Sequence, residues 1–95
     1  MVCTLRDYTV APAPTFGLPP DSERRSLRVG QYAKLVFTAT PDDDSQGERM
    51  WVEVTEVIGV GVYAGKLAND PVVMPIKCGI AVNFAWNNVV SILEV

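Results

Sequence analysis

Two segments of this chain alternate apolar and polar side chains with a period of two residues. In residues 31–39 one face carries Ala33, Leu35, Phe37 and Ala39, and the other carries Tyr32, Lys34, Val36 and Thr38. In residues 49–58 the alternating apolar positions are Met50, Val52 and Val54. A period of two is typical of a β-strand with one buried face. No segment keeps a 3.6-residue period over eleven positions, so the sequence predicts a mainly β protein.

Three further strands are expected in the second half of the chain. They cover residues 62–67, 80–84 and 89–95. Gly59 and Gly61 mark a turn before the first of them, because glycine adopts turn conformations at no steric cost. Residues 40–48 contain a proline, three aspartates and a glycine, which are typical of a loop. The chain is therefore expected to hold five main strands joined by short links.

The order and length of these strands indicate a closed sheet. Five strands in one flat sheet would leave an apolar face in water. We therefore expect a mainly β fold (β or α+β), in which a small, strongly bent antiparallel sheet closes as an SH3-like barrel or roll. The polar residues 21–26 predict one short helical turn, with Asp21 or Ser22 as its N-cap.

The length of 95 residues allows one small domain. Four of the seven prolines fall in residues 1–20, which we expect to form a Pro-rich irregular arm. Phe16 and Leu18 are its expected anchors on the domain. Residues 21–95 are expected to form the single β-barrel-like domain.

Composition excludes several classes of function. The chain has no histidine, which rules out mechanisms that need imidazole as a base or a metal ligand. Its formal net charge of −3 argues against nucleic-acid binding. The longest uncharged stretch, residues 78–93, is short for a membrane helix and contains three asparagines. We expect no catalytic residues, no cofactor, no metal, no nucleic acid and no membrane contact.

The acidic and thiol groups have simple structural interpretations. Glu48 stands beside an aromatic residue and is a candidate general acid or base, but a turn or ion-pair role is expected. Asp42, Asp43 and Asp44 lack the spacing of a calcium loop, and we expect a solvated loop. Cys3 and Cys78 are expected to be free thiols in the cytoplasm, with a disulfide between them as the alternative.

The order of three sequence blocks resembles a known family. The blocks are L-R-V-G-Q-Y-A-K-L-V-F at 27–37, G-E-R-M-W-V-E-V-T-E-V at 47–57 and Y-A-G-K-L-A-N-D-P at 63–71, followed by K-C-G-I-A-V-N-F at 77–84. Together the E-x-M-W-V and G-x-L-x-N-x-P blocks resemble the YegJ-like bacterial domain of unknown function. The resemblance implies a compact α+β or β domain and no reaction. Such domains often carry a histidine near the last strand, where this chain has Asn87, Asn88 and Val89.

Large aromatic side chains give the strongest functional hint. Trp51 falls on the face opposite Met50, Val52 and Val54, beside Glu53. Exposed tryptophan and tyrosine are enriched in binding hot spots. The expected binding surface consists of Trp51, Tyr63, Trp86, Glu53 and Asn69. The alternative is that the curvature of the barrel, or the arm, covers the aromatic rings.

Three functions follow from these expectations. The first is a non-catalytic binding module that engages a protein, a peptide or a second copy of itself as a homodimer. The second is an acidic inhibitor or nucleic-acid mimic of a mobile-element type, which would use Asp42–Asp44 with Glu48, Glu53 and Glu56. The third is a small-molecule-binding domain, for which no convergent set of polar residues is visible.

Overall fold

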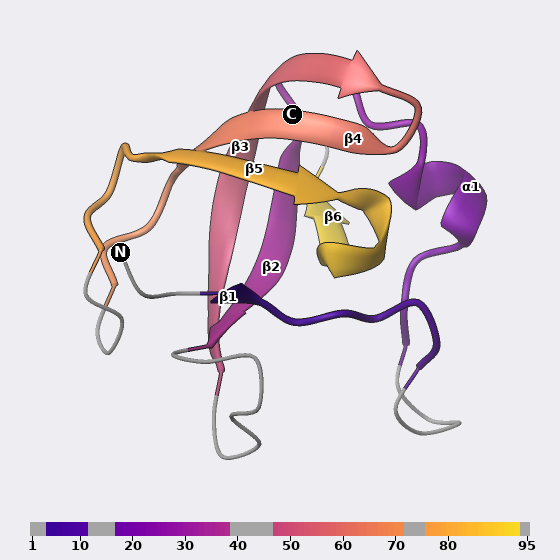
Figure 1. Ribbon diagram of the computed structural model, residues 1–95, viewed down its shortest axis with the longest axis horizontal. Helices are drawn as coiled ribbons and strands as arrows, with labels where there is room; N and C mark the ends of the chain where they lie inside the picture. The colour runs from indigo at the N-terminus through magenta and orange to yellow at the C-terminus, as the bar shows by residue number, and fades with distance from the viewer. Residues whose placement is uncertain (1–3, 12–16, 39–46, 72–75, 94–95) are drawn as a thin grey trace.

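The computed structural model describes residues 4–11, 17–38, 47–71 and 76–93. Within these ranges it is one six-stranded antiparallel sheet, nearly closed as a barrel, with two single helical turns (Figure 1). The elements in chain order are β1 (Thr4–Leu5), α1 (Asp21–Arg24), β2 (Tyr32–Thr38), β3 (Glu48–Gly59), β4 (Val62–Leu67), β5 (Ala81–Ala85), the 3₁₀ turn η1 (Trp86–Asn88) and β6 (Val89–Leu93). No helix in the described ranges is long and apolar enough to cross a membrane.

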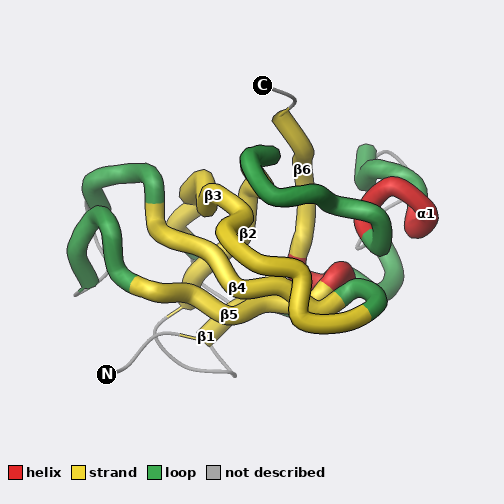
Figure 2. The backbone as a smooth tube through the Cα atoms, turned by 90° about the horizontal axis from the view of Figure 1, so that it is seen from above, coloured by secondary structure: helices red, strands yellow, loops and turns green. Residues whose placement is uncertain are grey.

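The strand order closes the sheet. β2, β3, β4 and β5 pair in sequence, and β6 returns to pair with β2. Because β3 occupies one edge of β2, the other edge is shared between β6, opposite residues 32–35, and β1, opposite residues 37–38. Figure 2 shows β6 running steeply across the direction of β4 and β5. The expected strongly bent antiparallel sheet with one short helical turn is confirmed.

The longest strand, β3, is irregular at two places in its pairing with β4. Its register with β4 shifts between Val54 and Glu56 and again between Val57 and Gly59. Each shift is a bulge, which increases the local twist of a strand. Gly65 lies opposite the first bulge, where an added Cβ would strike the main-chain oxygen of Glu53. A glycine is therefore required where the two backbones approach most closely.

The interior is filled by the alternating positions that the sequence predicts. Leu35 on β2 and Met50, Val52 and Val54 on β3 are buried in the main core. Among the described residues, the buried cluster consists of Leu27, Ala33, Leu35, Phe37, Met50, Val52, Val54, Tyr63, Leu67, Val82, Phe84 and Val89. Val36 is buried too, although it lies on the opposite face of β2, and there it packs with Tyr8, Val90 and Leu18. The alternation alone did not show that the arm covers this part of the outer face.

The N-terminal arm is more ordered than the sequence indicated. β1 pairs Thr4 with Thr38 and Leu5 with Phe37, so the expectation of an entirely irregular arm is wrong at these residues. Tyr8 then donates its backbone N–H to the carbonyl of Asn87 at 2.7 Å. Leu18 packs on the Tyr8 cluster, as expected of an anchor, whereas Phe16 lies outside the described residues.

The arm is also held by Asp7. Its carboxylate accepts hydrogen bonds from the Thr9 hydroxyl, from the Thr9 backbone N–H and from the Asn87 side chain. The bond from the Thr9 hydroxyl, followed by the one from Asn87, holds the pKa of the Asp7 carboxyl below its ordinary value. The ionised form of Asp7 therefore connects the arm to η1.

The helical turn α1 forms where the sequence predicts it, but with a different cap. Its N-cap is Pro20 and no side chain caps it, so the expectation that Asp21 or Ser22 is the cap is wrong. The Asp21 carboxylate instead accepts a hydrogen bond from the guanidinium of Arg24, at 2.8 Å. The Asp21 carboxylate thus binds the buried Arg24 guanidinium and caps no backbone N–H of the helix.

Candidate functional site

Tyr63 belongs to the core and not to a binding surface. Its side chain has no exposed area, and its ring lies 5.3 Å from that of Phe84. The hydroxyl donates to the carbonyl of Arg24 at 2.8 Å and accepts from the backbone N–H of Leu27 at 3.1 Å. The sequence-based assignment of Tyr63 to the surface is therefore wrong. β4 directs the Tyr63 ring into the core. The Tyr63 hydroxyl forms hydrogen bonds with the backbone at the end of α1 and just after it.

Replacing Tyr63 with phenylalanine is expected to lower the free energy of unfolding by about 2 kcal/mol, because it leaves a buried N–H and a buried C=O without their partner. Urea denaturation followed by fluorescence measures this change. Tyr32→Phe is the matched control, since Tyr32 is half-exposed and should change stability by less than about 0.5 kcal/mol. Equal stability of the two variants would contradict this role for the Tyr63 hydroxyl.

Trp51 and Glu53 lie on the same face of β3, and Asn69 lies beside Trp51 just after the end of β4. The Trp51 side chain is half-buried, and the ammonium nitrogen of Lys34 lies 4.8 Å from the centre of its ring. The Asn69 side-chain oxygen accepts the backbone N–H of Trp51, while the Trp51 carbonyl accepts the N–H of Ala68. Asn69 thus extends the β3–β4 pairing beyond the end of β4. We assign it a structural role.

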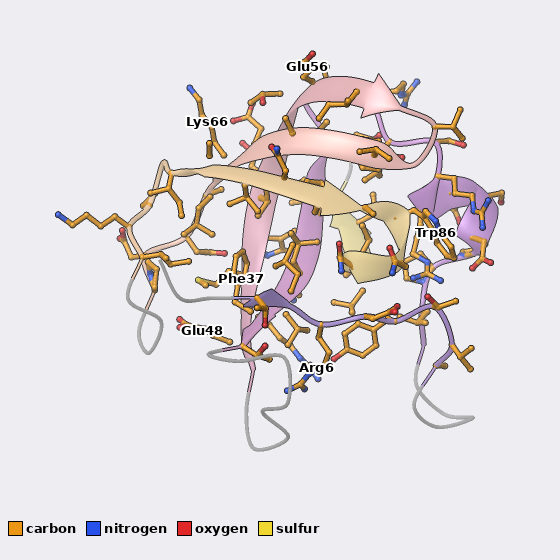
Figure 3. The ribbon with its side chains drawn as sticks, viewed as in Figure 1. Arg6, Phe37, Glu48, Glu56, Lys66 and Trp86 are labelled. Carbon is orange, nitrogen blue, oxygen red and sulfur yellow. The ribbon has the colours of Figure 1, made fainter. Side chains whose placement is uncertain are left out.

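The register places Trp51 on an outer face of the sheet that carries both aromatic and charged side chains. Tyr32 stands between Glu53 and Leu93 across the strands, and Lys34 stands between Trp51 and Ser91. Glu53 is also opposite Lys66 of β4. Charges of both signs therefore surround the two half-exposed aromatic rings. Figure 3 shows Lys66 and Glu56 directed away from the barrel on this side of the molecule.

Trp86 lies at a different place, beside α1 (Figure 3). It opens η1, and its backbone N–H donates to the carbonyl of Gly61 at 2.8 Å. Its indole lies against the β3–β4 turn, because a Cβ added at Gly61 would come within 2.8 Å of the ring. Trp86 is hydrogen-bonded to Gly61, just before β4, whereas Trp51 is hydrogen-bonded to Ala68, just after β4. The two tryptophans are therefore about 20 Å apart along the strand. They do not form one surface.

Two consecutive arginines hold the Trp86 ring. The guanidinium carbon of Arg25 lies 4.1 Å from the ring centre and that of Arg24 lies 5.0 Å away. These are cation–π distances. Arg25 is exposed, whereas Arg24 is 1% exposed and donates to the carbonyls of Tyr8 and Val89 at 3.0 and 3.2 Å. Arg24 therefore connects the arm, α1 and the start of β6, and Arg25 covers the ring from the solvent side.

The tip of the β3–β4 hairpin exposes large apolar side chains next to Trp86. Val57 is 46% exposed, Ile58 53%, Val60 88% and Val62 43%. We call these four residues, with Trp86 and Arg25, the hairpin-tip surface. The sequence contained a signal for it, since V-I-G-V-G-V places apolar residues around a turn where polar ones are usual.

The remaining candidate groups do not converge on a reactive site. Glu48 pairs with Phe37 in the β2–β3 register and is half-buried. Cys78 is exposed and free, and its thiol lies 3.5 Å from the carbonyl of Leu67. Asp42–Asp44 and Cys3 lie outside the described residues. Among the residues that the structure does describe, no three His, Cys, Asp or Glu side chains gather as a metal site would require.

Comparison of the chain with protein-family models, curated proteins and solved structures finds no match. The resemblance to the YegJ-like domain therefore stays a prediction. The site must be interpreted from its own geometry.

Proposed function

We propose that this chain is a non-catalytic binding module that docks a protein or peptide through the hairpin-tip surface. The observation that carries this proposal is the exposure of Val57, Ile58, Val60 and Val62 within six residues of a well-formed hairpin. Soluble proteins rarely expose large contiguous apolar patches, and those they do expose are often interaction sites. The non-catalytic part of the proposal rests on a sequence without histidine.

Trp86 and Arg25 supply the specific part of this surface. The indole is held by Gly61 and by both arginines, so little of its side-chain freedom would be lost on binding. Within the described ranges Arg25 contacts no carboxylate. Its guanidinium donors are therefore available for an acidic group of the partner. An apolar segment with a nearby carboxylate is the partner chemistry that fits.

Neither alternative function has a specific observation in its favour. Glu53 stands opposite Lys66, and Lys34 shares its face, so the described part of this face is not a continuous negative stripe. An apolar groove beside β5 has a volume of about 200 Å³, which is small for a drug-sized ligand. We also propose a cytoplasmic location, supported by the exposed free thiol of Cys78.

Replacing Val60 with aspartate is expected to weaken partner binding at least tenfold while leaving the fold intact. Val60 is 88% exposed, so a charge there costs little in the free chain but must be desolvated in an apolar interface. Capture from host lysate, followed by calorimetry with the captured protein, measures the change. Analytical ultracentrifugation of the chain alone tests self-association through the same residue.

Val10→Asp is the matched control, because Val10 is 80% exposed and lies on the arm. Both variants add the same charge at a similar exposure. If they retain the same partners and the same affinities, the hairpin tip is not the docking surface. If only Val60→Asp loses binding, the proposal is supported.

A further inference from the structure

The strand β5 pairs on one edge only within the described residues. Its partner is β4, from Val62 opposite Ala85 to Lys66 opposite Ala81. Two hydrogen bonds determine which backbone groups face β4. The N–H of Leu67 donates to the carbonyl of Ile80, and the N–H of Ala85 donates to the Asn88 side chain. Because backbone groups alternate along a strand, residues 80, 82 and 84 face β4 and residues 81, 83 and 85 face outward.

Most of these outward groups have no hydrogen-bond partner among the residues that the structure describes. Asn88 satisfies the N–H of Ala85. In the described part of the chain, no hydrogen bond involves the backbone N–H or C=O of Ala81 or Asn83, and both residues are exposed. The edge therefore presents two donors and two acceptors in the spacing of a strand. Such an edge is a template for another strand.

An apolar groove of about 200 Å³ runs beside this edge. It lies between β5 and the paired segment of β1 and β2, which contributes Leu5 and Phe37. The complete described lining is Leu5, Phe37, Ile76, Ile80, Ala81, Val82 and Asn83. Phe37 and Val82 belong to the main core, and Leu5, Ile76 and Ile80 pack against it. An apolar side chain that enters here would therefore contact the core directly.

We propose that the outer edge of β5 accepts an extended segment of another protein as an added strand, with one apolar side chain seated in the groove. The main-chain groups of Ala81 and Asn83 supply the hydrogen bonds, and the groove selects the side chain. No ionisable side chain contributes to the described lining, so the seated side chain is uncharged. This site is separate from the hairpin-tip surface, which involves Trp86 and the β3–β4 turn.

A second copy of this chain is a poorer occupant of the groove. In a symmetric pairing its own β5 would lie along the edge. The inward side chains of that strand, Val82 and Phe84, are already buried in its own core. They cannot enter a neighbour's groove without leaving that core. A segment with free side chains is required.

A library of random seven-residue peptides displayed on phage, selected on the intact chain, tests this proposal. We expect enriched peptides to alternate apolar and polar residues and to contain no proline at their centre. Asn83→Pro removes an outward N–H and leaves the inward groups of Val82 and Phe84 in place, as an edge strand tolerates. Synthetic peptides from the enriched pool are expected to bind this variant at least tenfold more weakly. Asn83→Thr, which keeps the N–H, is the matched control and should bind as the unaltered chain does.

Amide hydrogen exchange gives a second measurement on the unaltered chain. Bound peptide is expected to slow exchange at Ala81 and Asn83, with the backbone of Val60 unchanged. The proposal is overturned if the selected peptides show no alternating pattern, or if they bind Asn83→Pro and Asn83→Thr equally well. It is also overturned if bound peptide slows amide exchange only at the hairpin tip. A chain that is dimeric on its own, and monomeric as Asn83→Pro, would also overturn it, because a second copy would then occupy the edge.

Discussion

Replacing Arg24 with methionine is expected to lower the free energy of unfolding by about 3 kcal/mol, which corresponds to roughly 15 °C in Tm for a chain of this size. Methionine keeps most of the aliphatic length but removes every donor. The carbonyls of Tyr8 and Val89, which accept from Arg24 at 3.0 and 3.2 Å, then lose their charged partner inside the protein. Thermal and urea unfolding measure the loss.

The desolvation cost of burying Arg24, which the methionine variant would avoid, is smaller than this loss. Burial of Arg24 carries a desolvation cost, and its Nε is buried without a partner among the described residues. The ion pair with Asp21 adds little, because the Asp21 side chain is 61% exposed. Methionine would relieve the desolvation cost, but the acceptors are backbone carbonyls that no side-chain substitution removes. The loss of the charge-assisted hydrogen bonds from Arg24 to these carbonyls therefore determines the sign.

Arg25→Met is the matched control for this prediction. It makes the same chemical change at the next residue, where the guanidinium is exposed and contacts only the Trp86 ring among the described residues. Its effect on stability should stay below about 1 kcal/mol. Equal losses for Arg24→Met and Arg25→Met would show that the buried hydrogen bonds do not stabilise the junction of the arm, α1 and β6.

Replacing Gly65 with alanine is expected to destabilise the barrel by roughly 3 kcal/mol, because overpacking against backbone cannot be relieved by a side-chain rotation. The added Cβ would strike the main-chain oxygen of Glu53 and lie 2.6 Å from Cγ1 of Val52. β3 and β4 would have to separate beside the bulge that bends the sheet. Calorimetric unfolding measures the lower Tm, and amide exchange along β4 locates the change.

Gly59→Ala serves as its control. Gly59 is also paired in the β3–β4 ladder, but an added Cβ there meets no atom within 4 Å. The change in stability at Gly59 should stay within about 0.5 kcal/mol. A Gly65→Ala variant as stable as Gly59→Ala would contradict the close approach of the two strands.

The period-two alternation predicted the position of some residues of the candidate site and not of others. Alternation correctly placed Met50, Val52 and Val54 inside and left Trp51 half-exposed on the outer face. It could not show that Tyr63 points inward, because the polar end of a tyrosine suits water or a buried carbonyl equally well. Nor could it show that Trp51 and Trp86 lie near opposite ends of β4. Their separation depends on which strands pair and in which register.

The class of fold is predictable from the sequence, because a period of two over residues 31–39 and 49–58 leaves one face of each strand apolar. Glycine-rich and polar turns limit the lengths of the strands. The fold must bury those faces, and a short chain does so by bending its sheet. The burial of Arg24 and the contact of Tyr63 with α1 depend on tertiary contacts, and so does the absence, among the described residues, of a cover over the hairpin tip and the outer edge of β5. Burial of a polar group and exposure of an apolar one depend on contacts between residues far apart in the chain. A local pattern carries no information about which distant segment supplies the partner.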